Sequence, residues 1–116
     1  MAASPTQRTL AYLRKEGWTA NVTEKWIPQA RRRADLFGGI DIVAIKADPP
    51  VTVGIQCTSV SNQSARRTKL LGLKDIKTWM LAGNEVWVIG WGKKMVGRRP
   101  RWLPTIRKLS IEEFEI

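Results

Sequence analysis

The sequence predicts one α/β domain of 116 residues, with a central mixed β-sheet flanked by helices. Residues 40–46 and 51–59 are rich in Ile and Val and are separated only by residues 47–50, which predicts an antiparallel hairpin. Residues 65–81 carry apolar side chains at helical spacing, and residues 85–91 are apolar on both faces, as in a buried strand. A chain of this length has room for one modest hydrophobic core.

The N-terminal third predicts a helix followed by a strand. Residues 6–16 place Leu10 and Leu13 at near-helical spacing, after the capping pair Ser4-Pro5. Residues 18–26 alternate imperfectly and predict one strand. Residues 31–33 are three arginines, which predict a solvated loop or the approach to the next strand.

The C-terminal half predicts a helix and two strands. Residues 60–64 read as a polar loop, and the helix over residues 65–81 has a possible break at Gly72. Residues 93–101 contain Gly, Pro and many cations and predict a basic loop. Residues 102–109 predict an edge strand, followed by a short helical tail capped by Ser110.

The chain has no histidine and one cysteine, Cys57. This excludes Ser-His-Asp and Cys-His triads, histidine-ligated metals, internal disulfides and cysteine-rich zinc sites. An enzyme with this composition must work with carboxylates, amides, hydroxyls, lysines, arginines and a metal ion.

The charge balance predicts a polyanionic partner. Lys and Arg number 20 against 10 Asp and Glu, which gives a net charge of +10. The alternative is a basic protein that is only kept soluble by its charge. No apolar run approaches the ~20 residues that cross a membrane, and MAASPTQRTL lacks the apolar core of a signal peptide. With the single cysteine, this predicts a non-membrane protein in a reducing compartment.

One constellation of residues indicates metal chemistry. Asp41 opens the first Ile/Val-rich strand, and Gln56 and Thr58 lie two apart on the second, so their side chains share a face. A carboxylate beside polar groups on a neighbouring strand can hold a metal ion. In a strongly basic chain, such a site suggests chemistry on a phosphodiester backbone.

The ordered set of motifs resembles the PD-(D/E)XK nuclease superfamily, and within it the archaeal-type Holliday junction resolvases and related phage-encoded nucleases. The resemblance covers roughly residues 6–95 and rests on QRTLAYLRKEGW, IDIVAI, GIQCTS and WMLAGNEVWVIGW. It implies one restriction-endonuclease-like domain over residues 1–116, with elements in the order αβββαββ. It also implies Mg²⁺- or Mn²⁺-dependent cleavage of DNA in the cytoplasm of a bacterial or archaeal host cell.

Members of this superfamily use an acid on the first helix, an Asp on the second strand and an acid-x-Lys on the third. By this resemblance, Asp41 takes the place of the Asp, and Cys57 supplies a backbone carbonyl to the metal. Gln56 stands where the second acid is expected, and Thr58 where the Lys is expected. Gln7 falls near the helix acid, so the chain departs from the pattern at these last three positions.

Other residues are candidates to fill the missing roles. Asp35 is expected to pair with Arg32 or Arg33, with metal binding as the alternative. Glu24 either replaces the missing helix acid or is an exposed charge at a strand end. Because Thr58 carries no charge, a cation from the start of the next helix is expected to replace the lysine, and the candidates are Arg66, Arg67 and Lys69.

Basic segments predict contacts with DNA phosphates. The residues are Arg31, Arg32, Arg33, Arg66, Arg67, Lys93, Lys94, Arg98 and Arg99. Trp26, Trp91 and Trp102 lie beside these segments and are candidates for stacking on bases. The other tryptophans, Trp18, Trp79 and Trp87, are expected in the core.

These inferences predict a metal-dependent endonuclease, and the resemblance implies that it acts on branched, Holliday-junction-like DNA. The alternative is a non-catalytic DNA-binding module with a degenerate metal site on the same fold. A small RNA-binding protein is a third interpretation of a basic chain of this length. Resolvase-like function implies a two-fold homodimer, because two strands are cut symmetrically.

Overall fold

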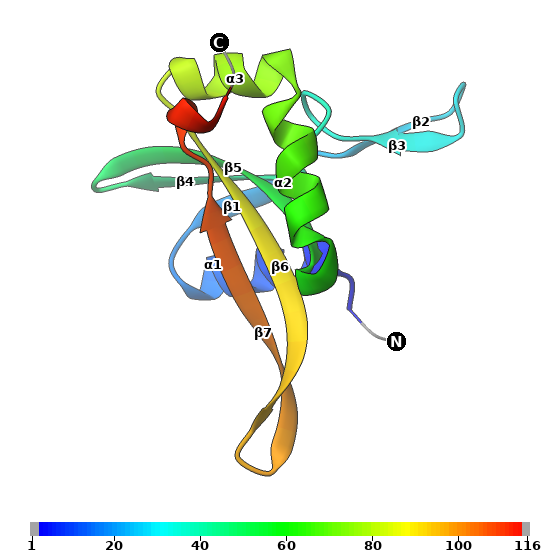
Figure 1. Cartoon of the computed structure of the whole chain (residues 1–116), viewed down its shortest axis with the longest axis vertical. Helices are drawn as coiled ribbons and strands as arrows, with labels where there is room; N and C mark the ends of the chain where they lie inside the picture. Colours follow the sequence, from blue (N-terminus) through cyan, green and yellow to red (C-terminus); the bar gives the residue numbers. More distant parts are fainter. Residues whose placement is uncertain (1–2, 115–116) are drawn as a thin grey trace.

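The computed structural model describes residues 3–114 and forms a mixed sheet with helices on both faces (Figure 1). The helices are α1 (Pro5–Lys15), α2 (Gln63–Leu71) and α3 (Lys74–Leu81), with short 3₁₀ helices η1 (Val60–Asn62) and η2 (Ile111–Glu113). The strands are β1 (Thr19–Val22), β2 (Lys25–Ile27), β3 (Arg32–Ala34), β4 (Ile42–Ala47), β5 (Pro50–Ser59), β6 (Glu85–Val96) and β7 (Arg99–Lys108).

Five strands form the main sheet in the order β1-β4-β5-β6-β7. The hairpin of β4 and β5 is antiparallel, with Ile42 opposite Ile55, as the sequence predicts. β5 and β6 are parallel, and α2 and α3 form the crossover connection that parallel neighbours require. The predicted α/β class with a mixed sheet flanked by helices is therefore confirmed.

The core has two layers, one on each face of the sheet. On one face, α1 packs Leu13 against β5 residues Ile55 and Cys57. On the other, α2 and α3 pack Leu70 and Ile76 against the sheet. The central strand β5 is buried on both faces, so Gln56, between Ile55 and Cys57, is also buried. A polar side chain there needs an internal partner.

The helix predicted over residues 65–81 breaks at Gly72 into α2 and α3, where the sequence placed the possible break. The predicted polar loop over residues 60–64 is instead η1 and the first turn of α2. The capped tail is confirmed, since Ser110 and Glu113 form a capping box around η2.

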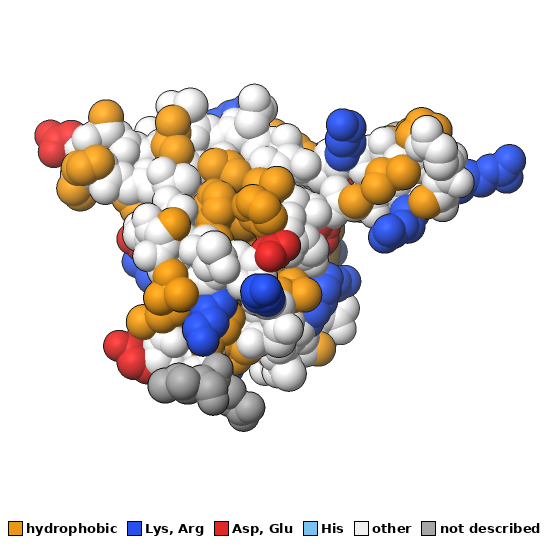
Figure 2. All heavy atoms as spheres, turned by 90° about the horizontal axis from the view of Figure 1, so that it is seen from above, with side chains coloured by type: hydrophobic (Ala, Val, Ile, Leu, Met, Phe, Trp, Pro, Cys, Tyr) orange, Lys and Arg blue, Asp and Glu red, His pale blue; other side chains and the backbone are white. Residues whose placement is uncertain are grey.

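The prediction of a single strand over residues 18–26 is wrong. β1 ends at Val22, and β2 belongs to a separate two-stranded sheet with β3, in which Trp26 lies opposite Arg33. The resulting β2–β3 hairpin extends away from the body and carries basic side chains at its end (Figures 1 and 2). Of the two predictions for residues 31–33, a solvated loop or the approach to a strand, the second holds: Arg31 lies in a turn, with a φ of 49°, and β3 follows.

The loop predicted over residues 93–101 is also wrong. β6 and β7 stay paired from Trp87 and Lys108 out to Val96 and Arg99, and this β6–β7 arm runs on past the body (Figure 1). The arm turns at Gly97, whose φ of 64° favours glycine. The sequence does not indicate these strands, because an exposed two-stranded arm buries neither face and so lacks the alternation of apolar and polar residues that predicts a strand.

The tryptophans are predicted to be either core residues or candidates for base stacking, and the structure differs from this prediction at one position. Trp87 is buried, as expected, but Trp91 is also buried and donates a hydrogen bond to Thr9 Oγ1 at 2.9 Å. Trp91 is therefore not available for stacking. Trp26 on the β2–β3 hairpin and Trp102 on the β6–β7 arm are exposed at 54% and 44%.

A tight loop between β3 and β4 brings Asp35 back toward the sheet. Leu36 and Ile40 exchange hydrogen bonds, and Phe37 adopts a φ of 54° in the turn between them. Phe37 lies against Trp79 of α3, with ring centroids 6.0 Å apart. In the view from above, hydrophobic side chains gather near the middle of the molecule (Figure 2).

No helix within residues 3–114 is long and apolar enough to cross a membrane.

Gly39 in this loop has no room for a side chain. A Cβ there would lie 2.2 Å from Leu70 Cδ2, and Leu70 is fully buried. We expect Gly39→Ala to destabilise the protein by about 1–3 kcal/mol, because the loop or α2 must move. Urea unfolding measures this change. The control is Gly72→Ala, where the nearest atom would be 3.5 Å away, and equal midpoints for the two variants would contradict the close packing.

Candidate functional site

Three carboxylates converge beside the beginning of β4. One carboxylate oxygen each from Glu24, Asp35 and Asp41 lies within 4.8 Å of the other two, and we call these residues the carboxylate cluster. Glu24 precedes β2, Asp35 follows β3 and Asp41 precedes β4. The base of the β2–β3 hairpin thus brings two acids to the predicted Asp41.

Backbone hydrogen bonds fix Asp41 between two neighbouring segments. Its N–H donates to Ile55 O at 2.8 Å, and its carbonyl accepts from Thr23 N at 2.8 Å. The Thr23 hydroxyl adds a bond to Ile40 O at 2.8 Å. Because Glu24 follows Thr23 directly, these bonds also hold Glu24 close to Asp41.

Two further hydrogen bonds orient the Asp41 side chain. Its Oδ2 accepts from the Cys57 N–H at 2.8 Å and from Gln56 Nε2 at 2.7 Å. Both donors belong to β5, so the predicted proximity of Asp41, Gln56 and Cys57 is present. The Cys57 backbone acts here through its N–H, whereas the resemblance assigned a role to its carbonyl. Burial raises the pKa of the Cys57 thiol to about 12, which keeps its sulfur protonated and a poor metal ligand.

The amide of Gln56 is only half satisfied. Its Oε1 is shielded from solvent and has no hydrogen-bond partner in the described part of the chain, although the side chain is only 2% exposed. A buried acceptor without a partner is costly and rare. Turning the amide by 180° would direct Oε1 at Asp41, and two oxygens facing each other need a cation or a proton between them.

The carboxylate cluster holds a proton near neutral pH. Burial and, next in size, a hydrogen bond shared with the neighbouring Asp35 carboxyl raise the pKa of Asp41 from 3.8 to about 7. The Cys57 N–H acts in the opposite direction, because it stabilises the charged form. Perturbed carboxyl groups of this kind are typical of functional sites.

The structure pairs the hairpin arginine differently from the prediction. Arg33 Nη1 lies 3.0 Å from Glu24 Oε1, and Asp35, the expected partner of Arg32 or Arg33, lies in the carboxylate cluster instead. Glu24 is also not an exposed charge at a strand end, because its side chain is 22% exposed. The antiparallel register of β2 and β3 accounts for this, since it brings Arg33 back to the base of the hairpin beside Glu24.

Other predicted residues lie outside the carboxylate cluster. Thr58 is buried on β5, and Gln7 Oε1 accepts from the Ser4 N–H in the cap of α1. α2 begins at Gln63, so Lys69 lies in its last turn and not near its start, and its side chain is exposed. Arg67 pairs with Glu113 of η2. Arg66 is half-buried and, within residues 3–114, forms no ion pair.

A hollow of about 430 Å³ opens beside the carboxylate cluster. It is lined by Ser4, Thr6, Gln7, Val22, Glu24 and Arg33. The capping motif of α1 was visible in the sequence, but nothing there indicated that the helix start faces Glu24. That proximity depends on how α1 packs against β1, which is tertiary information.

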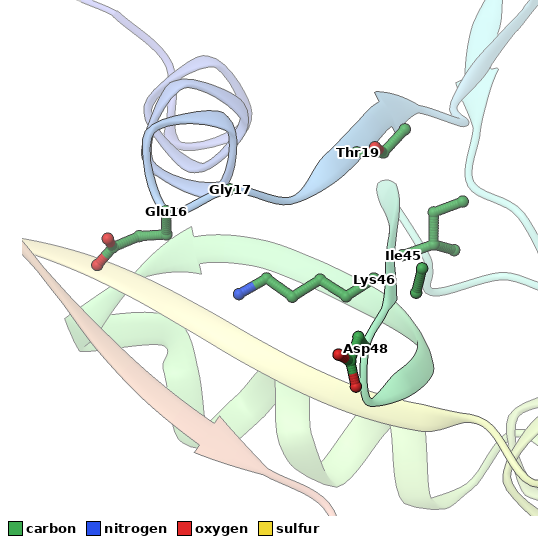
Figure 3. A pocket seen from close by; sticks show the side chains of 7 residues that line it. Glu16, Gly17, Thr19, Ile45, Lys46 and Asp48 are labelled. Carbon is green, nitrogen blue, oxygen red and sulfur yellow. The ribbon is translucent and has the colours of Figure 1, made fainter.

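A second hollow of similar volume lies at the other end of β4. Figure 3 shows Lys46 extending across it, between Glu16 and the turn that holds Asp48. Asp41 and Asp48 flank the two ends of β4, which separates them by roughly 20 Å of extended chain. Lys46 Nζ also lies 4.6 Å from the Trp18 ring. This hollow is therefore separate from the carboxylate cluster.

Comparison with family models, with curated proteins and with solved structures finds no match to this chain. The chemistry of the site must therefore be argued from its own residues.

The raised pKa of Asp41 predicts a pH-dependent stability. Folded Asp41 holds its proton up to about pH 7, whereas the unfolded chain releases it near pH 3.8, so the stabilising effect is complete below pH 3.8. It is lost as the pH rises to about 7, on the order of 4 kcal/mol in all. We expect the metal-free protein to melt at a lower temperature at pH 8 than at pH 5. No histidine is present to add its own titration in this range.

Asp41→Asn removes this dependence. Asn retains an oxygen for the Cys57 N–H and gains an amide that can donate to Gln56 Oε1. Its melting temperature should therefore change little between pH 5 and pH 8. Asp48→Asn, at the other end of β4, is the matched control and should follow the wild-type curve. A pH profile of Asp41→Asn identical to that of the wild type would contradict the assignment.

Proposed function

We propose that this protein is a metal-dependent endonuclease that hydrolyses the phosphodiester backbone of DNA. The observation that carries the proposal is the convergence of Glu24, Asp35 and Asp41 beside the unpartnered, buried Oε1 of Gln56. Three carboxylates in contact repel one another unless a cation or a proton lies between them. The net charge of +10 supports a polyanionic substrate.

The donor set fits Mg²⁺ or Mn²⁺. Both ions prefer oxygen ligands, and the cluster offers carboxylates together with one amide oxygen. The residues that would hold the ion are Asp41, Asp35 and Glu24, with Gln56 Oε1, once its amide is turned, as a further ligand. The Cys57 backbone donates its N–H to Asp41, so it would orient that carboxylate and not bind the ion. When bound, such an ion polarises a phosphoryl oxygen and promotes deprotonation of water.

The chain order supports a restriction-endonuclease-like arrangement for the main sheet. Without the β2–β3 hairpin, the elements follow the order α1, β1, β4, β5, the α2–α3 crossover, β6 and β7, as the resemblance implies. Asp41 precedes the second of these strands, and Gln56 and Thr58 lie on the third. The resemblance further implies branched DNA as the substrate and a two-fold homodimer as the active assembly.

Two projecting hairpins support contact with nucleic acid. Both are basic, and each carries an exposed tryptophan, Trp26 on the β2–β3 hairpin and Trp102 on the β6–β7 arm. Trp102 lies beneath Arg8 of α1, 4.2 Å from ring centroid to guanidinium carbon, with Lys93 Nζ at 5.9 Å. This arrangement joins the arm to the body and gathers positive charge beside an aromatic ring, which suits phosphate contacts and base stacking.

Hydrolysis of a phosphodiester requires a proton acceptor for the attacking water and a positive charge near the phosphate. A water oxygen forms a bond to phosphorus, one P–O ester bond breaks, and a proton from the water passes to a carboxylate. The leaving oxygen takes a proton from solvent, so the balance is the addition of one water. The cluster supplies the acceptor for the proton, and a cation must offset the charge that develops on the phosphate.

A non-catalytic DNA-binding module is the second candidate. Arg33 already offsets part of the charge of the cluster by pairing with Glu24, and Gln56 and Thr58 bring no charge to β5. The ion pair and the neutral Gln56 lower the affinity for a metal ion relative to a site with an acid on that strand. The neutral Thr58 leaves β5 without a cation to stabilise the charge that develops in catalysis. An RNA-binding role is the third candidate, and the same basic hairpins would serve it.

Asp41→Asn separates the two DNA-binding proposals. We expect wild-type protein with Mg²⁺ or Mn²⁺ to cut four-way junction DNA, and we expect EDTA to abolish cutting. Asp41→Asn should reduce the rate by at least ~10²-fold without weakening DNA binding, because it loses a charged ligand but no cation. Single-turnover cleavage and fluorescence anisotropy measure the two effects, with duplex, single-stranded DNA and RNA as comparison substrates.

Gln56→Glu is the matched variant, since it restores an acid on β5. It should lower the Mn²⁺ concentration that gives half-maximal cleavage, and destabilise the metal-free protein by adding a fourth carboxylate. An unchanged metal requirement would show that Gln56 is not a ligand. A wild-type protein that binds junctions but cuts none of the substrates with either metal would establish the binding module instead.

The salt dependence of DNA binding tests whether the β6–β7 arm contacts phosphates. Replacing Lys93 and Lys94 by Ala should weaken binding to all DNA sequences alike, and reduce the slope of log K against log[salt] by about 1 to 2. The control is the double replacement of Lys74 and Lys77 on α3, which removes the same charge away from both hairpins. A loss of affinity confined to one sequence would contradict a phosphate-contact role.

A further inference from the structure

The central strand brings no cation to the carboxylate cluster. Thr58 is buried and uncharged, so a phosphate at this site has no positive partner on β5. Phosphoryl transfer depends largely on positioning and on stabilising the charge that develops on the phosphoryl oxygens. If the proposed function holds, another element must supply that charge.

The ion pairs show which element brings a cation to the carboxylate cluster. Within residues 3–114 there are two, Arg67 with Glu113 and Arg33 with Glu24, and only the second involves an acid of the carboxylate cluster. Arg67 is directed to the C-terminal 3₁₀ helix instead. Lys69 and Arg66, the other cations of α2 predicted for this role, make no ion pair with the cluster.

Arg33 also faces a space that can admit a phosphate group. It is the one cation among the residues that line the hollow of about 430 Å³, and Glu24 belongs both to that lining and to the carboxylate cluster. The first turn of α1 also lines this hollow, with Ser4 as its N-cap and Thr6 in the first turn. The positive end of a helix dipole and a guanidinium therefore face one hollow, and both favour an anion.

Most of the hydrogen-bonding capacity of Arg33 is free. Its one side-chain hydrogen bond among the described residues is made by Nη1 to Glu24 Oε1 at 3.0 Å, and its side chain is 66% exposed. A guanidinium has five N–H donors in a planar fork, so it can bind Glu24 and a phosphate oxygen together. The β2–β3 pairing holds its backbone opposite Trp26, at a fixed distance from the base of the hairpin.

We propose that Arg33 is the phosphate-binding cation of this site, acting from the β2–β3 hairpin in place of the cation that β5 lacks. The proposal rests on the proposed function for its catalytic part and on the hollow beside Glu24 for its binding part. Arg33 makes and breaks no covalent bond. It contacts the non-bridging oxygens of the phosphate that lies between the hollow and the carboxylate cluster.

The first test measures phosphate binding without catalysis. Dimethyl phosphate, a minimal phosphodiester, is titrated into metal-free and Ca²⁺-containing protein while the arginine Nε–H signals are followed by NMR. The Arg33 signal, assigned from its absence in Arg33→Ala, should shift in a saturable manner. Lys25→Ala is the control, because it removes one charge from the opposite face of the same hairpin and should leave that shift in place.

The second test measures cleavage and metal binding in the same variants. Arg33→Ala should reduce single-turnover cleavage by ~10²-fold or more, and Arg33→Lys should recover at least part of the loss. Mn²⁺ binding, measured by EPR, should be unchanged or tighter in Arg33→Ala, because Glu24 loses a competing partner. The control is Lys77→Ala, which removes one charge from α3, away from both hairpins, and should cleave at close to the wild-type rate.

The outcomes separate this proposal from the proposed function. Weaker Mn²⁺ binding in Arg33→Ala would mean that Arg33 only shapes the cluster, and full cleavage in that variant, or a loss confined to Lys69→Ala, would assign the cation to another element. Each of these results overturns the proposal. If the wild type cuts nothing, the proposed function fails, and the titration decides alone: a saturable Arg33 shift supports the phosphate site, and its absence refutes it.

Discussion

The two hydrogen bonds accepted by Asp41 Oδ2 connect the beginning of β4 to the middle of β5. Cys57 donates from the backbone, and Gln56 donates from a side chain that is almost completely buried. The backbone N–H of Asp41 bonds to Ile55 on the same strand, so one residue is attached to β5 at three consecutive positions. The direction of the Asp41 carboxylate is therefore fixed by the sheet itself. The loops that carry Glu24 and Asp35 are placed relative to this fixed carboxylate, by Thr23 on one side and by the Leu36–Ile40 turn on the other.

This arrangement opposes the stability of the domain. Burial and a neighbouring carboxyl raise the pKa of Asp41 to about 7, so above that pH the cluster holds negative charges that repel one another. The Gln56 oxygen adds a buried acceptor without a partner. A sequence selected only for stability would replace such groups with apolar ones, since the surrounding core of Ile42, Ile55 and Ile89 is fully buried. Unfavourable polar groups that persist in a well-packed core are most simply explained by a ligand that satisfies them.

The sequence predicted the buried parts of the fold better than the exposed ones. The β4–β5 hairpin, the break at Gly72 and the cap at Ser110 each leave a local signature, namely an apolar run, a helix breaker or a capping residue. The β2–β3 hairpin and the β6–β7 arm leave none, because both faces of each are exposed and their composition is that of a basic loop. In the site, the contact of Asp41 with β5 followed from the strand pattern. The approach of Glu24 and the pairing of Arg33 with it did not, since both depend on a hairpin that the sequence does not reveal.

The base of the β2–β3 hairpin carries acidic and basic groups of the kind that the resemblance leads one to expect on β5. On β5, Gln56 and Thr58 are neutral where the resemblance leads one to expect an acid and a lysine. Glu24 precedes the hairpin, Asp35 follows it, and Arg33 lies on its second strand, so this one hairpin brings two acids and one cation to Asp41. Under the proposed function, the charged groups of the site therefore come from the base of a projecting hairpin and not from β5. Because that hairpin also carries exposed Trp26 and the other arginines, nucleic acid that binds it would act directly on the segment that completes the site. Substrate binding and assembly of the catalytic groups would then be one event, since the same short strands perform both.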